Sequence, residues 1–213
     1  MGWLTDPAFT ALLVRGFATT FLLAATVIVT SNLLALLLAI YLQQPAARLR
    51  RIVVGYSFFA RAVPALALLF GLYYGLPAVG IYLEPIPSAL AGLVFASTAY
   101  NLEFLRSGFE SIAPGQREAA RALGLRPAIV YAKVLVPQAY ASAAPALFSN
   151  AIQIVKGSAL ASLVAVDELS AASTTIVAET YEAIPVLAFV AALYMLIAGG
   201  ILALQYLYER RLR

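Results

Sequence analysis

The stretch GQREAARALGLRPAIVYAKVLVP, residues 115–137, is a polar, basic insert between hydrophobic segments long enough to cross a lipid bilayer. It is rich in Ala, Arg and Glu, which favour helix, so we expect a short helix over 116–123. Gly124 is placed to end that helix in a left-handed conformation, and Arg126-Pro127 opens the next helical stretch. A short structured insert of this kind usually presents itself to a partner.

The composition of the chain is that of a membrane protein. Of its 213 residues 63% are hydrophobic and 11% are charged, and the mean hydropathy is +0.90. A soluble domain carries about 25% charged residues. The net charge of +4 comes from basic residues at segment ends, which argues for orientation in a membrane and against nucleic-acid binding. We expect one membrane domain over residues 1–213.

The sequence also limits the chemistry of the chain. It contains no Cys and no His, which excludes thiol redox chemistry, Cys/His metal sites and His-based acid–base catalysis. We expect no catalytic residue, no metal site and no cofactor in this chain. The N-terminus has no basic region typical of a cleaved signal peptide, so the first span is expected to act as its own insertion signal.

Uncharged runs predict an all-α membrane protein with five transmembrane helices, since a span needs about 20 apolar residues. The third span is expected to open at Pro87, because proline fits the first turn of a helix. A polar loop at 107–133 separates the third span from the fourth, and 166–182 is interpreted as a polar surface segment. The predicted spans cover 16–42, 52–76, 87–105, 134–157 and 183–208.

Lys and Arg predict the orientation of the spans. With five spans, the basic groups after span one, around the polar loop and after span five lie on one side, which should be the cytosol. The basic groups are Arg48, Arg50, Arg51, Arg106, Arg117, Arg121, Arg126, Lys133, Arg210, Arg211 and Arg213. The opposite side carries Asp6, Glu84, Asp167, Glu168, Glu179 and Glu182, with Arg15 as its only basic residue. We therefore predict an outside N-terminus and a cytosolic C-terminus.

The short helix of the insert combines small and charged side chains. Pro114-Gly115 is expected to make the turn before it. Small residues allow close approach to a partner surface, and charges can pair at its rim. The side chains concerned are Arg117, Glu118, Ala119, Ala120, Arg121 and Ala122. A solvated loop helix without a partner is the alternative, and the spacing alone does not decide between the two.

Polar side chains share one face of the fourth span. Ser142, Ala146, Asn150, Gln153 and Gly157 follow i, i+4, i+8, i+11, i+15 spacing. The third span has a face that can join it, formed by Ser97, Tyr100 and Phe104. We interpret these faces as the lining of a central path. Helix packing is the alternative, because small and polar residues also hold helices together in lipid.

Three ionisable residues, Arg61, Glu103 and Lys156, lie at membrane depth. A charge at that depth costs roughly 2.5–3.5 kcal/mol on insertion scales. Each also has a structural explanation. Glu103 can pair with Arg106 at i,i+3, whereas Arg61 and Lys156 can extend toward the membrane surface, or Arg61 can fix a kink at Pro64. Facing the path, Glu103 would favour a cationic substrate and Lys156 a carboxylate.

The insert resembles the EAA motif of ABC importer permeases. Glu118-Ala119-Ala120 is followed after three residues by Gly124 and, after nine further residues, by Val134-x-Val136-Pro137. The family pattern ends Ile-x-Leu-Pro, so the valines are mild departures. RAVPALALLFGLYYGLP at 61–77 is similar to the RGTPLLVQLFFLYYGLP region of polar amino-acid permeases. Segments 111–124, 136–139 and 207–213 match that subfamily too, and the resemblance covers nearly the whole chain.

The resemblance implies a type I ABC importer permease fold, multi-pass in the bacterial cytoplasmic (inner) membrane. The implied partners are a second permease subunit, identical or a sister chain, an extracytoplasmic substrate-binding protein and two cytosolic ATPase subunits. Each ATPase would receive one EAA helix, and its ATP-driven closure would rock the spans from inward-open to outward-open. ATP and Mg belong to the ATPase, since this chain has no GxxxxGK[ST] motif. The coupling residues implied are Gly115, Gln116, Glu118, Ala119, Ala120, Arg121, Leu123 and Gly124.

The resemblance also implies a polar amino-acid substrate, and one departure bears on its charge. The family often has Lys-Asp-Thr-Ser-Leu where this chain has KGSAL at 156–160, which lacks a carboxylate that would help to hold a cation. This departure indicates either a different substrate or a sister subunit that supplies the contacts. The expected substrate path includes Arg61, Ser97, Tyr100, Glu103, Asn150, Gln153, Lys156 and Ser158. An opine, a sulfur amino acid or an organic cation are alternative substrates. A membrane-anchored assembly protein without a path, or a channel or secondary transporter without an ATPase, are alternative functions.

Overall fold

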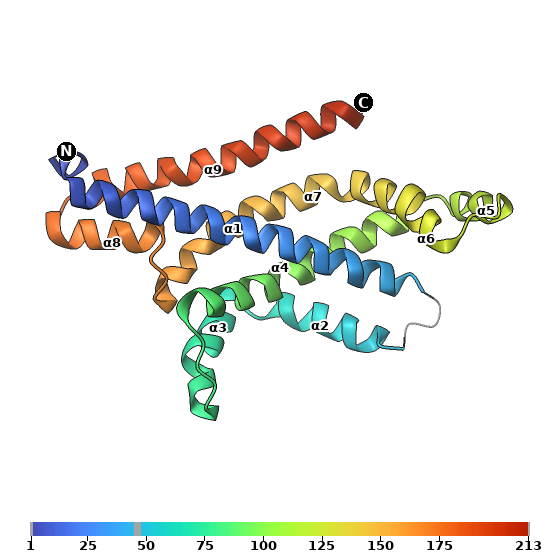
Figure 1. Cartoon of the computed structure of the whole chain (residues 1–213), viewed down its shortest axis with the longest axis horizontal. Coiled ribbons are helices and arrows are strands. Elements are labelled where there is room, and N and C mark those ends of the chain that lie inside the picture. Colours follow the sequence, from blue (N-terminus) through green and yellow to red (C-terminus); the bar gives the residue numbers. More distant parts are fainter. Residues whose placement is uncertain (1, 45–47, 213) are drawn as a thin grey trace.

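The computed structural model is all-helical over the residues that it describes, 2–44 and 48–212, and its longer helices run along one axis (Figure 1). Residues 1, 45–47 and 213 lie outside the described residues, so the predicted C-terminal basic group is followed only as far as Arg211. The elements are η1 (Gly2–Thr5), α1 (Pro7–Leu42), α2 (Arg50–Ala62), α3 (Ala65–Phe70), η2 (Gly71–Gly75), η3 (Leu76–Val79), α4 (Pro85–Glu110), α5 (Pro114–Ala122), α6 (Pro127–Val130), η4 (Tyr131–Leu135), α7 (Val136–Gly157), η5 (Ser158–Val164), α8 (Leu169–Thr180) and α9 (Ala183–Leu212).

Three helical stretches of the described chain are long and apolar enough to cross a membrane: Pro7–Leu42, Pro127–Val164 and Ala183–Arg211. The bent pair formed by α2 and the helical stretch Ala65–Val79 makes a fourth if it counts as one span. α4 is also long, but its prolines and its Ser, Thr, Asn and Glu side chains make it less apolar. It tolerates them because it packs against α1, α2, α3 and α7, which bury much of its surface.

Prolines mark where helices begin. The Asp6 Oδ1 accepts a hydrogen bond of 2.8 Å from the N–H of Ala8, and Pro7 occupies the first turn. α1 therefore begins at Pro7, before the predicted span start at residue 16. α4 likewise begins at Pro85, so the expected start at Pro87 is two residues late. Both starts were visible as an acidic residue followed directly by proline.

The predicted second span, 52–76, is not one continuous helix, which corrects the sequence-based expectation. α2 ends at Ala62, Val63 is extended with φ −86° and ψ 130°, and α3 starts after Pro64. The two parts are bent by 103° relative to each other. Proline has no N–H to continue the helix and disfavours helical backbone in the residue before it, which places the break at Val63.

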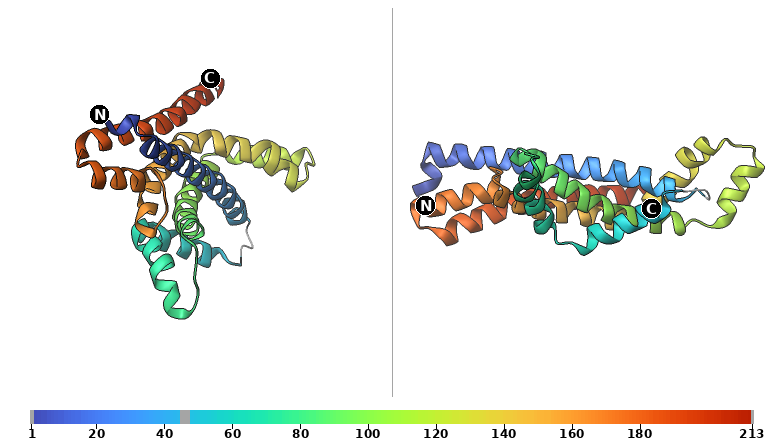
Figure 2. Two further views of the ribbon diagram at one scale, coloured as in Figure 1. Left: turned by 60° about the vertical axis from the view of Figure 1, so that its left-hand side comes forward. Right: turned by 90° about the horizontal axis from the view of Figure 1, so that it is seen from below.

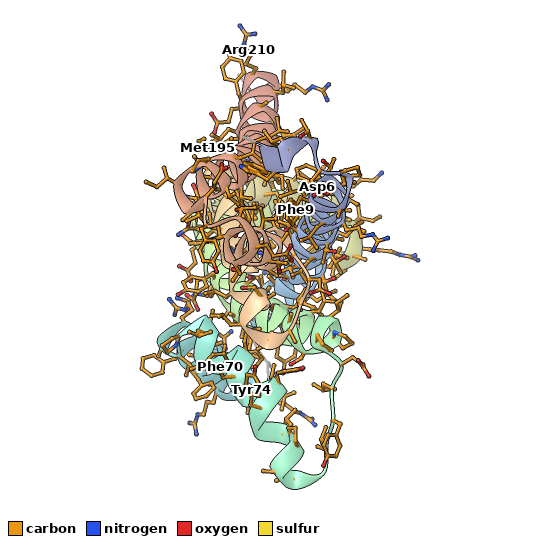
Figure 3. The ribbon with its side chains drawn as sticks, turned by 90° about the vertical axis from the view of Figure 1, so that its left-hand side faces the viewer. Asp6, Phe9, Phe70, Tyr74, Met195 and Arg210 are labelled. Carbon is orange, nitrogen blue, oxygen red and sulfur yellow. The ribbon has the colours of Figure 1, made fainter. Side chains whose placement is uncertain are left out.

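After α3 the chain projects from the side of the bundle over residues 71–84 (Figures 1 and 2). A π-helical turn, η2, precedes Pro77, just as the π-helical turn η4 precedes Pro137. A wider turn accommodates a residue that cannot donate a backbone hydrogen bond. Figure 3 shows Phe70 and Tyr74 on this projection, and their rings meet edge to face at 5.5 Å between centroids. The Tyr74 hydroxyl donates to the Leu163 carbonyl at 3.1 Å, which ties the base of the projection to η5.

α4 and α7 approach each other closely at Gly108. A Cβ added to Gly108 would collide with the carbonyl oxygen of Ala139, whose Cα would lie 3.3 Å away. Both residues are fully or almost fully buried. Small residues let helix backbones approach closely in lipid, where apolar side chains alone give little driving force for association. This contact joins α4 to α7 at the end of the bundle from which α5 emerges (Figure 1).

The C-terminal ends of α1 and α9 lie toward the same end of the molecule as α5 (Figures 1 and 2). The N-terminus and α8 lie at the opposite end. The three basic groups predicted to share one side of the membrane are therefore found at one end of the fold. Which side of the membrane this end faces stays a prediction from the charge distribution.

Segment 166–182 differs from the polar surface segment expected. It contains α8, which packs against α1 and α9, and Glu168 at its start is fully buried. The Glu168 Oε1 accepts from the Ala171 N–H at 2.9 Å, and its Oε2 accepts from the hydroxyls of Thr20 and Tyr194. A helix N-terminus has free N–H groups that favour a carboxylate, which explains why this charge-bearing group lies inside.

We expect Gly108→Ala to lower the stability of the purified protein by about 1–3 kcal/mol, because an overpacked contact forces two backbones apart. The thermal unfolding midpoint in detergent measures this. Gly199→Ala is the matched control, since nothing lies within 4 Å of a Cβ at that position in α9 and alanine favours helix. Equal midpoints for the Gly108 variant and the wild type would show that α4 and α7 do not depend on this contact.

Burial raises the pKa of the Glu168 carboxyl above its ordinary value, although its hydrogen bonds partly offset the rise. A raised pKa means that the folded protein binds this proton more tightly than the unfolded chain does. The stability of the fold therefore falls as pH rises from the ordinary carboxyl pKa of about 4.3 up through the raised value. We expect Glu168→Gln to remove that part of the decline in stability, measured by thermal midpoints at successive pH values. Asp167→Asn, at an exposed neighbouring position, should keep the wild-type slope. Parallel curves for Glu168→Gln and wild type would contradict the prediction.

Candidate functional site

α5 is a short capped helix, as the sequence predicts. The N–H of Gly124 donates to the Arg121 carbonyl at 2.9 Å and the N–H of Leu125 to the Ala120 carbonyl at 3.2 Å. Gly124 has φ +67°, the left-handed conformation expected of it. The helix begins at Pro114, so Gly115 lies in its first turn and not in a turn before it.

The sides of α5 have different environments. Ala120 is 4% exposed and packs into the core shared by α1, α4 and α7. Arg117 is half-buried, and its Nη2 donates to the Oε1 of Gln43 at 2.6 Å, which ties α5 to the end of α1. Nothing in the sequence pointed to this bond. Leu123 is 77% exposed. The other predicted coupling residues are exposed too: Gly115, Gln116, Glu118, Ala119, Arg121 and Gly124.

A cavity of about 590 Å³ lies between α4, α7 and the start of α3. Ser97, Tyr100 and Phe104 of α4 line one wall, and the α7 residues Ala146, Asn150, Gln153 and Gly157 line another. The structure thus brings together the two polar faces that helical spacing had selected. The volume lies within the range of about 300–1,000 Å³ that is usual for small-molecule sites.

Three other residues of the predicted polar set lie away from this cavity. Ser142 accepts a hydrogen bond of 3.0 Å from Ser111 near the α5 end. Lys156 is exposed and is not among the residues that line the cavity. Ser158 is fully buried and donates to the carbonyl of Val155 at 2.7 Å, which occupies its hydroxyl. The helical period placed Lys156 beside the polar face but did not determine which way it turns.

Glu103 is held by neighbours on α2 and α4. Its Oε2 lies 2.9 Å from Arg106 Nη2, and its Oε1 accepts from the Ser57 hydroxyl at 2.7 Å and lies 3.7 Å from Arg61 Nη2. The i,i+3 pair expected as the structural explanation is therefore present. Arg61 also donates its Nε–H to the Ser57 carbonyl, beside the break at Pro64. The group joins α2 to α4, and neither Arg61 nor Glu103 lines the cavity.

One polar residue next to the cavity was missed from the sequence. Asn101 is 1% exposed, and its Oδ1 accepts a hydrogen bond of 2.8 Å from Asn150 Nδ2. An Asn in a predicted span is costly unless it is bonded, which was a usable signal. Its partner was not deducible, since it lies 49 residues away.

A second recess of about 810 Å³ opens where α1, α4 and η5 meet. It is lined by Arg15, Glu84 and Asp167 and therefore carries both signs of charge. All three belong to the face predicted to lie outside. The molecule thus offers the helix α5 at one end, a cavity with several polar side chains between α4 and α7, and a charged recess near the start of α4.

Comparison with known proteins gives a consistent result. Residues 31–213 match the family described as binding-protein-dependent transport system inner membrane component. The chain is 29% identical to the probable amino-acid ABC transporter permease protein YckA of Bacillus subtilis, over 93% of this chain and 88% of that protein. It is 30% identical to the nopaline transport system permease protein NocM of Agrobacterium fabrum, over 88% and 86% of the two chains.

A third relative is the L-cystine transport system permease protein TcyB of Bacillus subtilis, 30% identical over 98% of this chain and 90% of that protein. Among solved structures, a chain of an amino acid ABC transporter with histidines superposes with a TM-score of 0.86, at 28% identity and with 98% of both chains covered. A chain of the MetNI methionine ABC transporter gives 0.81 at 21% identity, covering 98% of this chain and 99% of that one, which shows a shared fold.

We expect Glu103→Gln to weaken the attachment of α2 to α4, because it removes the charge shared by Arg61 and Arg106. Losing a partly buried ion pair of this kind should lower the thermal midpoint by a few degrees. Glu110→Gln is the control: it removes a carboxylate that is 66% exposed and 3.7 Å from Arg106, and should have little effect. If both variants unfold like the wild type, the group around Glu103 does not hold the helices together.

Proposed function

This chain belongs to the family of binding-protein-dependent transport system inner membrane components, and we propose that it is the permease subunit of an ABC importer that moves a polar amino acid. It is a multi-pass membrane protein of the type I permease fold. Its path for the solute is the cavity between α4 and α7. The energy comes from ATP hydrolysed by separate ATPase subunits, which hold ATP and Mg.

One observation carries the proposal: α5 lies in the connection between the two helices that line the cavity. α4 ends at Glu110 and α5 begins at Pro114, and α6 and η4 then lead into α7. Ala120 anchors α5 in the core formed by the same helices. A force applied to α5 therefore reaches both cavity walls through short connections, which is the arrangement that a coupling element requires.

The exposed side of α5 is the proposed contact with an ATPase. Small Ala119 permits close approach, Leu123 offers an apolar side chain, and Glu118 and Arg121 can form ion pairs at the rim. Arg117 instead holds α5 to α1 through Gln43, so α1 follows its displacement. Closure of two ATPases would bring two such helices together, one from each permease subunit, and move the spans from inward-open to outward-open.

The charged recess near Arg15, Glu84 and Asp167 is proposed to face the extracytoplasmic binding protein. It lies away from α5, at the end assigned to the outside by the distribution of Lys and Arg. Charges of both signs at a rim favour correct orientation of a partner more than tight binding. A second permease subunit, identical or a sister chain, completes the membrane part.

A polar amino acid is the proposed solute, because the cavity combines Ser97, Tyr100, Asn150 and Gln153 with apolar walls. An opine is the second candidate, favoured by the similarity to a nopaline permease over most of both chains. A sulfur amino acid comes next, given the cystine permease relative, and an organic cation is the remaining alternative. Glu103 gives a cation little support, since Arg61 and Arg106 already share its charge.

The test is import into proteoliposomes that contain this chain, its second permease subunit and its ATPase, with binding protein supplied on the substrate side. We expect uptake of a radiolabelled amino acid or octopine that requires ATP and the binding protein together. Uptake driven by an ion gradient without ATP would instead show a secondary transporter. Folded complexes that import none of the tested solutes under any condition would support a role in assembly.

In the same assay, Gly124→Val and Glu118→Lys should abolish ATP-dependent import and co-purification of the ATPase, while the chain still inserts in the membrane. Valine at φ +67° strains the end of α5, and the lysine reverses a charge on its exposed side. Gly199→Ala serves as the control with an open environment in α9. Normal co-purification of the ATPase with both variants would refute the coupling role of α5.

A further inference from the structure

A line of hydrogen bonds runs behind the cavity and crosses three helices. Asn150 Nδ2 on α7 donates to Asn101 Oδ1 on α4 at 2.8 Å, and Asn101 Nδ2 donates to Ser31 Oγ on α1 at 3.1 Å. The Ser31 hydroxyl in turn donates to the carbonyl of Ile28 at 3.3 Å. Ser31 is fully buried and Asn101 is 1% exposed, so water does not compete for the bond between them.

The bonds all point in one direction, from α7 through α4 to the backbone of α1. The Ile28 carbonyl accepts from Asn32 Nδ2 at 2.9 Å as well as from Ser31, and with the Ser31 hydrogen turned toward it the lone pairs of Ser31 are left for Asn101. Asn101 must then present its oxygen to α7. Reversing one amide alone would set two N–H groups or two oxygens against each other, and an unpaired buried polar group costs about 1–3 kcal/mol.

This direction determines what Asn150 presents to the cavity. Its Nδ2 is engaged by Asn101, whereas its Oδ1 accepts no hydrogen bond from any residue that the structure describes. Asn150 itself lines the cavity, and Asn101 does not. We propose that Asn101 is a positioning residue that holds Asn150 with its carbonyl oxygen offered to an N–H group of the solute, an inference that rests on the proposed transport function.

The chemistry of the cavity fits a neutral acceptor of this kind. Arg61, Glu103 and Lys156 do not line it, so the polar groups at its walls are hydroxyls and amides. Within the described chain the side chains of Ser97, Ser149 and Gln153 also make no hydrogen bond, which leaves them to the solute. The solute class recognised at Asn150 is one with an ammonium, amide or guanidinium N–H. A site that is built to bond such a group discriminates strongly against analogues without it.

The test uses the reconstituted complex with its binding protein, and L-arginine, L-glutamine, octopine and L-glutamate as radiolabelled probes. Kinetics follow the N–H-rich probe that the wild type imports fastest. Asn101→Leu should lower kcat/KM for that probe about tenfold, mainly by raising KM. A change of about tenfold is what the loss of one oriented hydrogen bond is expected to cause. Ser31→Ala touches neither Asn150 nor the cavity, and should cause a smaller loss in the same direction. Asn101→Asp, which keeps an oxygen toward Asn150, should retain most of the activity.

The double variant Asn101→Leu/Asn150→Leu should import no worse than Asn150→Leu alone, because both changes remove the same contact. Ser88→Ala, which deletes another fully buried hydroxyl of α4, should leave the kinetics unchanged.

Additive losses, or an equal fall in kcat for every probe, would overturn the positioning role and leave a packing role. If Asn101→Leu fails to assemble, Ser31→Ala and Asn101→Asp decide by the same KM criterion. No ATP-dependent import by the wild type would overturn the proposed function and this inference together, whereas normal import by Ser31→Ala and Asn101→Leu would overturn the inference alone.

Discussion

The contact of Gly108 with the backbone of Ala139 is the constraint on which the rest of the structure depends. In a bilayer, apolar side chains are as well accommodated by lipid as by each other, so helices associate through close packing and hydrogen bonds. This contact brings α4 against α7 at one end of the bundle. Farther along, Tyr100 and Asn150 face a shared cavity, and at the near end the short connection leaves α5 exposed. The proposed solute path and the proposed coupling helix therefore both depend on one helix pair.

Buried polar groups supply the remaining connections, and each joins different helices. Glu168 ties the start of α8 to α1 and α9, Glu103 ties α4 to α2, and Asn101 ties α4 to α1 and α7. Such groups are costly to bury unless their hydrogen bonds are satisfied, and satisfied networks fix one arrangement of the helices. Where the backbone itself cannot be satisfied, at Pro64, Pro77 and Pro137, the chain breaks or widens its helix.

The same connections separate rigid parts from parts free to move. α4, α7 and α1 are joined by polar bonds and close packing, so they should move together when α5 is displaced. The segment at 71–84 is attached at its base by the packing of η2 against α4 and by the Tyr74 hydrogen bond, and beyond that it projects from the bundle, with Val79 and Tyr82 largely exposed. The proposed coupling through α5 would thus act on two cavity walls that are joined to each other.

The sequence by itself determined whatever depends on local spacing: long apolar runs, the cap at Gly124, the i,i+3 pair of Glu103 with Arg106, and the shared face of Asn150 and Gln153. These follow from the helical period and from backbone preferences that each residue carries with it. The family of the chain, too, was predicted from its motifs and is confirmed. Only the tertiary structure decided which partner each polar group meets, as for Glu168 with Tyr194 and Asn150 with Asn101. Those pairs are formed by packing between segments far apart in the chain, and no local pattern in the sequence encodes that distance.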